Sequence, residues 1–367
     1  ESIYEYPMQQ GGGNDGRPYS FGRPSSGGSK AAYPCKSYGQ GRINPAYFYG
    51  VFDPNDMRRD VSITMTGSNG KGVEKLIPFV PNSKAEGGGL TLNKWDENRQ
   101  ANPWVAAQRK SGINGPYMRM SEVYLGYAEV CAALGDVVTG KQYLKTVRER
   151  SFPQGLANTD AFIASFGNDL VRAIIEERGF EYAGEGDRRW TLIRSGYLPE
   201  DIKRIKDMTK AMMDGLATKG YYEFENGNII SAYIWTKLVD AKTIYGHRLT
   251  AQCPTDKVND PVLYPGWRGQ KDNWEEMGLN YGSSTPATNL AIKGLFEIVS
   301  EEEAASLESQ GYAKVNWGID LVDYRDEYDK YLFWDYDYVS APIYLWPFTP
   351  NVMAAGGFTN GYGFKQE

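Results

Sequence analysis

The residues of this sequence that could do acid–base chemistry are concentrated between Ile174 and Arg194. This stretch carries nine charged side chains of both signs among apolar ones. Three of its glutamates, Glu177, Glu181 and Glu185, could serve as general acid and base. Three arginines lie close to them, however, and no other residue type nearby completes a catalytic constellation.

Paired charges are the simpler interpretation of this stretch. An unpaired charge in a protein interior is too costly, so acids and arginines beside buried apolar residues must find partners. We therefore expect interlocked helices in which these side chains are mostly buried, mutually paired and structural: Glu177, Arg178, Glu181, Glu185 and Arg188. An active site built on the three glutamates is the alternative.

Other residues with metal or nucleophilic chemistry are sparse. The single histidine, His247, argues against a Ser-His-Asp triad or a histidine-rich metal site. The cysteines Cys35, Cys131 and Cys253 are odd in number and scattered, so they form neither a disulfide framework nor a metal site. Four aspartates recur every three residues but miss the EF-hand spacing, which favours a solvated helix face over a cation site: Asp320, Asp323, Asp326 and Asp329. We predict no cofactor and no metal.

Aromatic residues on glycine-rich loops are the best candidates for ligand binding. The chain has 27 Tyr, 14 Phe and 9 Trp, with 42 Gly. A ring offers a flat apolar face, and an irregular loop can place it. Two loop regions, residues 9–50 and 245–290, carry rings with no evident role in helix packing. We predict these as ligand-binding residues: Tyr19, Phe21, Tyr33, Tyr38, Trp267 and Trp274.

Composition excludes several classes of protein. The 367 residues are enough for a large core, in one or two domains. The net charge of −6 argues against a nucleic-acid partner. No window approaches ~18 consecutive apolar residues, so the sequence predicts no membrane span.

Helices must position the charged stretch. Four apolar residues at helical spacing predict a helix that Gly184 and Gly186 end: Leu170, Val171, Ile174 and Ile175. A short helix over 188–194 should then bury three more: Trp190, Leu192 and Ile193. An amphipathic helix over 200–218 follows, and two strands within 221–235 flank the turn Asn226-Gly227.

The clearest helix should begin at Pro116 and end before Gly135, since proline suits a first turn and glycine a stop. Its expected inward face recurs every three or four residues: Met120, Val123, Tyr124, Tyr127, Ala128, Cys131 and Leu134. A second helix ending at Arg150 should pair with it as an antiparallel hairpin. A short strand is expected at residues 2–6.

These landmarks, in this order, resemble the SusD/RagB family, the outer-membrane nutrient-binding lipoproteins of Bacteroidetes. The charged stretch between Ile174 and Arg194 is similar to the family signature through Glu177-Arg178, Glu181, Gly184-Glu185-Gly186, Arg188 and Leu192-Ile193-Arg194. Thr191 stands where the family usually has an aspartate. The other matching motifs are Ser2-Ile3-Tyr4-Glu5, Asp53-Pro54, Tyr127-Ala128-Glu129, Val147-Arg148-Glu149-Arg150, Leu345-Trp346-Pro347 and Asn360-Gly361-Tyr362.

The resemblance implies a mainly helical fold with large irregular loops, a few short strands and tetratricopeptide-like helix pairs. It covers nearly all of this chain but only the later part of the family's usual length. We expect a single region over 1–367, with a loop- and strand-rich part at 1–115, a helical core at 116–220 and a loop-rich part at 221–367.

The resemblance also implies a function without catalysis. We expect cell-surface binding of an oligosaccharide and its delivery to a SusC-like TonB-dependent outer-membrane barrel. The protein would then sit at the outer membrane through a lipid anchor upstream of Glu1. The alternatives are a peptide-binding member of the family, a purely structural surface lipoprotein and a glycoside hydrolase on a helical scaffold. A hydrolase would need two carboxylates facing each other in a cleft, and the sequence cannot place them.

Overall fold

The computed structural model describes residues 2–9, 11, 44–68, 74–77, 90–95, 112–152, 155–240, 288–323, 337, 339–340, 343–345, 348–357 and 359. Its helices are α2 (Met57–Ser62), α3 (Met120–Ala133), α4 (Val137–Glu149), α5 (Thr159–Ala164), α6 (Leu170–Glu181), α7 (Asp187–Ser195), α8 (Leu198–Lys219), α10 (Glu301–Ser309), α11 (Gly318–Asp323) and α13 (Pro350–Gly356). A π-helical segment, η1, covers Ala46–Val51.

The strands are short and pair in small antiparallel sheets. They are β1 (Ser2–Tyr6), β2 (Ile63–Thr64), β3 (Thr66–Ser68), β4 (Glu74–Leu76), β5 (Thr91–Leu92), β6 (Gly115–Arg119), β7 (Tyr221–Glu223), β8 (Ile229–Ser231), β9 (Tyr233–Asp240), β10 (Thr288–Lys293) and β11 (Ala313–Asn316). β9 lies between β10 and β11, and the two-stranded pairs are β1–β6, β2–β5, β3–β4 and β7–β8.

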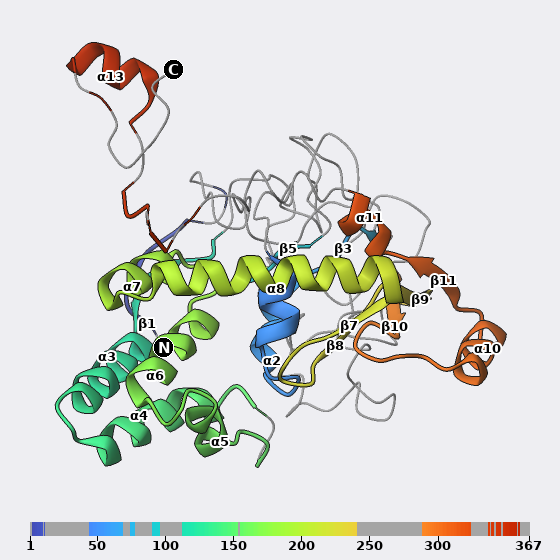
Figure 1. The fold of residues 1–367 in the computed structure, drawn as a ribbon, viewed down its shortest axis with the longest axis horizontal. Coiled ribbons are helices and arrows are strands. Elements are labelled where there is room, and N and C mark those ends of the chain that lie inside the picture. The colour runs from blue at the N-terminus through green and yellow to red at the C-terminus, as the bar shows by residue number, and fades with distance from the viewer. Residues whose placement is uncertain are drawn as a thin grey trace.

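The long helix α8 crosses the middle of the molecule (Figure 1). Helices α3 to α6 gather below one end of it, and the strands β7 to β11 lie toward the other end with α10. The predicted mainly helical fold with a few short strands is confirmed for the described residues.

Helices α3 and α4 form the predicted hairpin, but Pro116 does not open α3. Residues 115–119 form β6 instead, which pairs with β1, and the helix begins at Met120. A strand more than a hundred residues away thus competes for this segment. Proline is tolerated in such a two-stranded sheet because its missing N–H can face away from the partner strand.

The predicted inward face of α3 is wrong in part. The side chains that the helix buries are Ser121, Leu125, Ala128 and Cys131. Four of the predicted inward side chains are exposed: Met120, Val123, Tyr127 and Leu134. Apolar residues occupy more than one stripe of this helix, so periodicity alone could not select the stripe that packs on α4 and α6.

Helix α6 is buried along nearly its whole length, as a central helix should be. The Asp169 side chain caps its start by accepting from the backbone N–H of Arg172. After Glu181 the chain turns through Gly184 and Gly186, whose φ values of 76° and 89° suit glycine. The predicted break and the short helix after it are both confirmed.

The predicted burial of the α7 side chains holds for Leu192 but fails for Trp190, which is 56% exposed. Helix α8 extends two residues beyond its predicted start and one beyond its predicted end, with Pro199 in its first turn and Gly220, at φ 77°, after its last. Asn226-Gly227 forms the predicted turn between β7 and β8.

The largest hydrophobic core joins η1, α6, α8 and the strands that follow it. Phe52, Phe180, Met212, Ile230 and Trp317 belong to it and are all less than 9% exposed. A second core lies among α3, α4 and α6, around Leu125, Leu144 and Ile174. Helix α6 contributes to both, which makes it the element around which the described residues pack.

Candidate functional site

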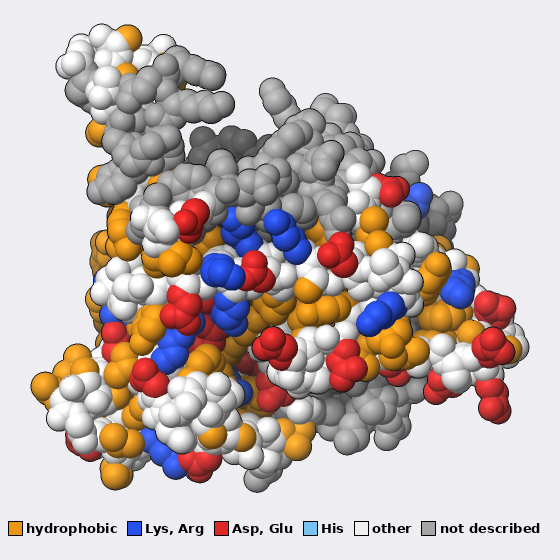
Figure 2. All heavy atoms as spheres, viewed as in Figure 1, with side chains coloured by type: hydrophobic (Ala, Val, Ile, Leu, Met, Phe, Trp, Pro, Cys, Tyr) orange, Lys and Arg blue, Asp and Glu red, His pale blue; other side chains and the backbone are white. Residues whose placement is uncertain are grey.

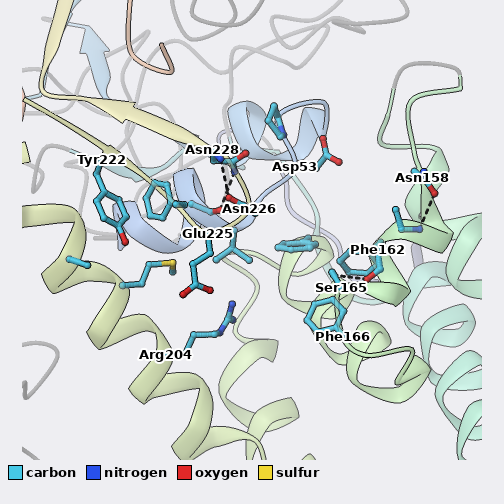
Figure 3. Close-up of a pocket in the computed structure, with 18 of the residues that line it drawn as sticks. Asp53, Asn158, Phe162, Ser165, Phe166, Arg204, Tyr222, Glu225, Asn226 and Asn228 are labelled. Carbon is cyan, nitrogen blue, oxygen red and sulfur yellow. Dashed lines mark hydrogen bonds between the residues drawn. The ribbon is translucent and has the colours of Figure 1, made fainter. Parts of the chain in front are cut away.

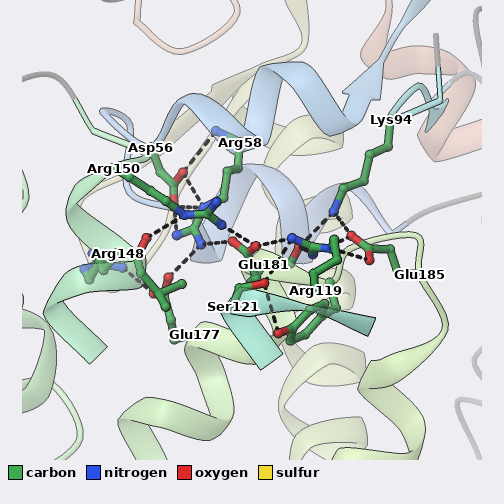
Figure 4. Close-up of polar contacts among 12 residues, drawn as sticks. Asp56, Arg58, Lys94, Arg119, Ser121, Arg148, Arg150, Glu177, Glu181 and Glu185 are labelled. Atoms are coloured by element: carbon green, nitrogen blue, oxygen red, sulfur yellow. Dashed lines mark hydrogen bonds and ion pairs between the residues drawn. The ribbon is translucent and has the colours of Figure 1, made fainter. Parts of the chain in front are cut away.

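Two glutamates of α6, Glu177 and Glu181, are surrounded by arginines from other elements (Figure 4). Arg58 of α2 contacts both, with Nη1 2.6 Å from Glu177 Oε1 and 3.1 Å from Glu181 Oε2. Arg148 of α4 lies 3.0 Å from the other oxygen of Glu177. Arg119, at the end of β6, lies 2.7 Å from Glu181.

The carboxylate of Glu181 is held ionised. Burial raises the pKa of Glu181, but the guanidiniums of Arg58, Arg150 and Arg119 outweigh burial and hold that pKa well below its usual range. The side chain is 2% exposed. A buried carboxylate that keeps its charge at neutral pH cannot donate a proton as a general acid. This favours the structural interpretation of the stretch over the catalytic one.

Glu176, the residue before Glu177 on α6, lies at the centre of a second cluster of ion pairs. Arg188 bridges Glu176 and Asp201 at 2.8 and 3.0 Å. Arg204 of α8 contacts the same two acids at 3.1 and 2.7 Å. Burial raises the pKa of Asp201, but Arg188 and Arg204 outweigh it, so that its pKa lies below the ordinary value.

The five charged residues are mostly buried, as predicted: Glu177, Arg178 and Glu181 are buried, and Glu185 and Arg188 are 13% and 24% exposed. The prediction that they pair with one another is wrong. Within the described part of the chain, no two of the five form an ion pair with each other; each pairs with another residue. Arg178, for example, lies 2.5 Å from Asp187 and donates from Nε to Thr191 Oγ1. Thr191 in turn donates to Asp187. The threonine that stands in place of the family's usual aspartate therefore hydrogen-bonds to both members of this ion pair.

A cavity of about 680 Å³ opens between η1, α5, α8 and the β7–β8 turn (Figure 3). This volume is typical of small-molecule sites. The aromatic lining residues are Phe162, Phe166, Phe180, Tyr222 and Phe224. The lining amides are Asn158, Asn226 and Asn228. The ionic lining residues are Asp53, Arg148, Arg204, Asp207 and Glu225.

The charged stretch positions two walls of this cavity. Glu177 holds Arg148, which also stacks 3.8 Å from the ring centroid of Phe162. Glu176 holds Arg204 on α8. Two adjacent glutamates of α6 therefore fix two guanidiniums that line the cavity.

The β7–β8 hairpin is fastened to η1 by side-chain amides. Asn228 Nδ2 donates to the carbonyl oxygens of Gly50 and Phe52, at 3.1 and 2.8 Å, and Asn226 Nδ2 donates to Gly50 at 2.7 Å. The ring of Phe224 lies so close to Gly50 that a Cβ there would be 2.4 Å from it. Only glycine fits, and the close contact fixes the cavity wall that carries Tyr222 and Glu225.

The cavity has the chemistry of a binding site for small polar molecules with apolar faces. Rings can stack on C–H surfaces, while amides and carboxylates can bond hydroxyl groups. No group of three or more His, Cys, Asp or Glu residues that could hold a metal ion occurs among the described residues. In that same part of the chain, every helix is too short or too polar to serve as a membrane span.

The six predicted ligand-binding residues lie outside the described residues, so their prediction stays untested: Tyr19, Phe21, Tyr33, Tyr38, Trp267 and Trp274. Sequence reasoning missed the cavity. A usable signal was the alternation of Tyr222 and Phe224 just before the Asn226-Gly227 turn, which places two rings on one face of a hairpin. The contribution of α5 and η1 had no comparable signal.

Comparisons with known proteins found one family model and two individual proteins to which this chain is similar. A family model described as the SusD family matches residues 1–349. The SusD-like protein P25 of Formosa agariphila is 28% identical over 160 residues, which are 43% of this chain. A crystal structure of a SusD homolog from Bacteroides thetaiotaomicron aligns with 59% of this chain and 44% of that chain, at 20% identity and a TM-score of 0.36. The matched part spans 26% of the length of the Formosa protein, about a quarter.

Proposed function

The chain belongs to the SusD family, and from that premise we propose that it binds an oligosaccharide at the cell surface without cleaving it. The observation that carries this proposal is the cavity of about 680 Å³ with aromatic walls and an amide-bearing rim. Sugars present both apolar C–H faces and hydroxyl groups, and this lining complements both.

The six aromatic residues of the two loop regions belong to the same proposal. Tyr19, Phe21, Tyr33 and Tyr38 precede η1 in the chain, and Trp267 and Trp274 fall between β9 and β10. η1 borders the cavity. We propose that these rings extend the binding surface beyond the cavity and give it length for a chain of several sugars.

The proposed partner is a SusC-like TonB-dependent outer-membrane barrel that receives the bound glycan. A lipid anchor upstream of Glu1 would hold the protein at the cell surface. The family match supports this arrangement, and fractionation of cells that express the full-length protein tests it. Recovery of the lipidated protein in the outer-membrane fraction, together with the barrel, is the expected result. Recovery in the periplasm or cytoplasm would contradict it.

The function itself is tested with a glycan array, followed by analysis of the bound sugars for cleavage products. We expect binding to a subset of oligosaccharides with no new reducing ends. Cleavage would identify a glycoside hydrolase instead, and binding restricted to a peptide library would identify a peptide-binding family member.

Alanine variants at the six aromatic positions test whether the two loop regions form part of the oligosaccharide-binding surface. Each ring that stacks on ligand should contribute roughly 1–3 kcal/mol of binding free energy. Melting temperatures should change by only a few degrees, because the substituted rings have no evident role in helix packing. Unchanged affinity in all six variants would place the site elsewhere.

A further inference from the structure

The two arginines of the cavity lining contact buried acids, which they share with other arginines. Arg148 pairs with the buried Glu177, 3.0 Å away. Arg204 contacts two buried acids, Glu176 at 3.1 Å and Asp201 at 2.7 Å. Neither guanidinium therefore offers a full, uncompensated positive charge to a ligand.

The lining carboxylates are less fully compensated. Asp207 pairs with Lys203 on the exposed side of α8. Asp53 lies 4.0 Å from Arg148, at the limit of an ion pair. Glu225 lines the cavity and makes no hydrogen bond or ion pair with any described residue, and Figure 3 shows its carboxylate pointing toward the side of the cavity that carries Arg204. The lining therefore holds three carboxylates and two guanidiniums, and the carboxylate without an ionic partner among the described residues lies at the β7–β8 turn.

Two aromatic rings line the same cavity as this carboxylate. Tyr222 and Phe224 precede Glu225 on the same hairpin, with ring centroids 4.9 Å apart in an edge-to-face arrangement. Burial, and after it the charge of Glu225, raise the pKa of Tyr222. The negative potential therefore reaches the ring. A carboxylate and aromatic rings that line one cavity can together attract an organic cation, whereas a second anion would be repelled.

We propose that this cavity selects a sugar that carries a protonated amino group and disfavours sugars that carry carboxylate or sulfate. The ammonium group is held between Glu225 and the face of Tyr222, and the rest of the sugar ring lies against the aromatic wall. This inference rests on the proposed glycan binding and names the class of sugar that the cavity takes.

Three oligomers of equal length test the charge preference: glucosamine, N-acetylglucosamine and galacturonic acid. Titration calorimetry at mildly acidic pH should give the tightest binding for the glucosamine oligomer, by about five-fold over the acetylated one, with the acidic oligomer weakest. The advantage should shrink as salt is added, because the carboxylate is exposed to solvent. Equal affinity for the first two oligomers, or tighter binding of the acidic one, would overturn the proposal.

Two variants of the hairpin assign the effect to one side chain. Glu225→Gln keeps the shape and should remove the preference for the amino sugar while leaving the acetylated oligomer unaffected. Glu223→Gln is the matched control, because Glu223 is exposed on the same hairpin but does not line the cavity. A preference that survives Glu225→Gln, or is lost equally in Glu223→Gln, contradicts the assignment.

Two further outcomes separate this inference from the function on which it rests. If no glycan of any charge binds, the proposed function fails. If neutral glycans bind and the amino group makes no difference, only the present inference fails. A lysine-containing peptide that binds as tightly as the glucosamine oligomer would show that the cavity recognises an ammonium group without the sugar, and would also overturn it.

Discussion

Around Glu181, three guanidiniums share one buried carboxylate, whereas at the cavity the carboxylate of Glu225 has no ionic partner among the described residues. Both regions contain arginines, acids and aromatic rings, and both are built on neighbours of α6. In the first region most of the side chains are buried and form ion pairs with one another. In the second, the acid and parts of the rings remain available.

The difference shows that residue type does not separate a structural cluster from a binding site. A charge whose partners are complete has nothing left to offer a ligand, and its removal costs stability. A charge without a partner costs little to remove, but it can change which ligand binds. The following predictions test this contrast, from the largest expected effect to the smallest.

Glu177→Ala should destabilise the protein by about 3–5 kcal/mol, the usual cost of removing one partner of a buried pair. Glu177 is fully buried, and its loss leaves Arg148, 3% exposed, with Asp53 at 4.0 Å as its nearest remaining acid. Urea unfolding followed by circular dichroism measures the change.

Glu200→Ala is the matched control for that variant. Glu200 is 68% exposed and lies 3.9 Å from Arg172. Its removal should change stability by no more than about 0.5 kcal/mol. Similar losses in the two variants would mean that the Glu177 cluster does not contribute as its burial indicates.

Acid should weaken the same cluster. The pKa of Glu181 is depressed in the folded protein, so its contribution is present above the unfolded value of about 4.3 and is lost as the pH falls toward the folded value. Asp201 is depressed as well and acts in the same direction. Stability should therefore fall from about pH 5 downward and stay nearly constant across neutral pH.

Glu181→Gln isolates this contribution. At neutral pH the variant should be less stable by about 2–3 kcal/mol, and its stability should fall less steeply in acid because one depressed carboxyl is gone. Unfolding midpoints measured over a pH series give both quantities. Parallel curves for the variant and the parent would contradict the assignment.

The sequence could predict the elements of this first region better than its contacts. The period of Leu170, Ile174 and Ile175 predicts α6, and the glycines after it predict its end, because both signals are local. The partners Arg58, Arg119 and Arg148 lie far away in the chain, and nothing in the local pattern identifies them. The same limit explains Pro116, whose segment is taken by the distant strand β1.

The cavity was less predictable still. The β7–β8 turn follows from Asn226-Gly227, but its attachment to η1 depends on the close approach of Phe224 to Gly50. Such an approach is a property of packing and has no period in the sequence. The aromatic loop residues rest on composition and remain a prediction, and so does the division of the chain at residues 115 and 220.

Tyr222→Ala should separate binding from stability. A ring that stacks on a sugar contributes roughly 1–3 kcal/mol to binding, so affinity for the cognate oligosaccharide should fall by about ten-fold or more. Tyr222 is half-buried, and stability should change less than it does for Glu177→Ala. Tyr221→Ala, on the same strand but not in the lining, is the control. Equal losses of affinity in both variants would point to a general disturbance of the hairpin.

The smallest effect should come from Lys203→Ala. Lys203 pairs with Asp207 across one turn of α8, with 62% and 61% of the two side chains exposed. Exposed pairs at this spacing contribute about 0.2–0.5 kcal/mol, so the unfolding midpoint should barely move.

The carboxylate of Asp207 belongs to the cavity lining, however, and the Lys203→Ala variant leaves it without its cation. The cavity becomes more negative, so affinity for the glucosamine oligomer should rise by up to about two-fold, while affinity for the acetylated oligomer stays the same. Paired titrations of both oligomers at low salt make the measurement. Two results would contradict the contrast between paired and available charges at this helix. One is a loss of stability as large as that of a broken buried pair, and the other is weaker binding of the glucosamine oligomer.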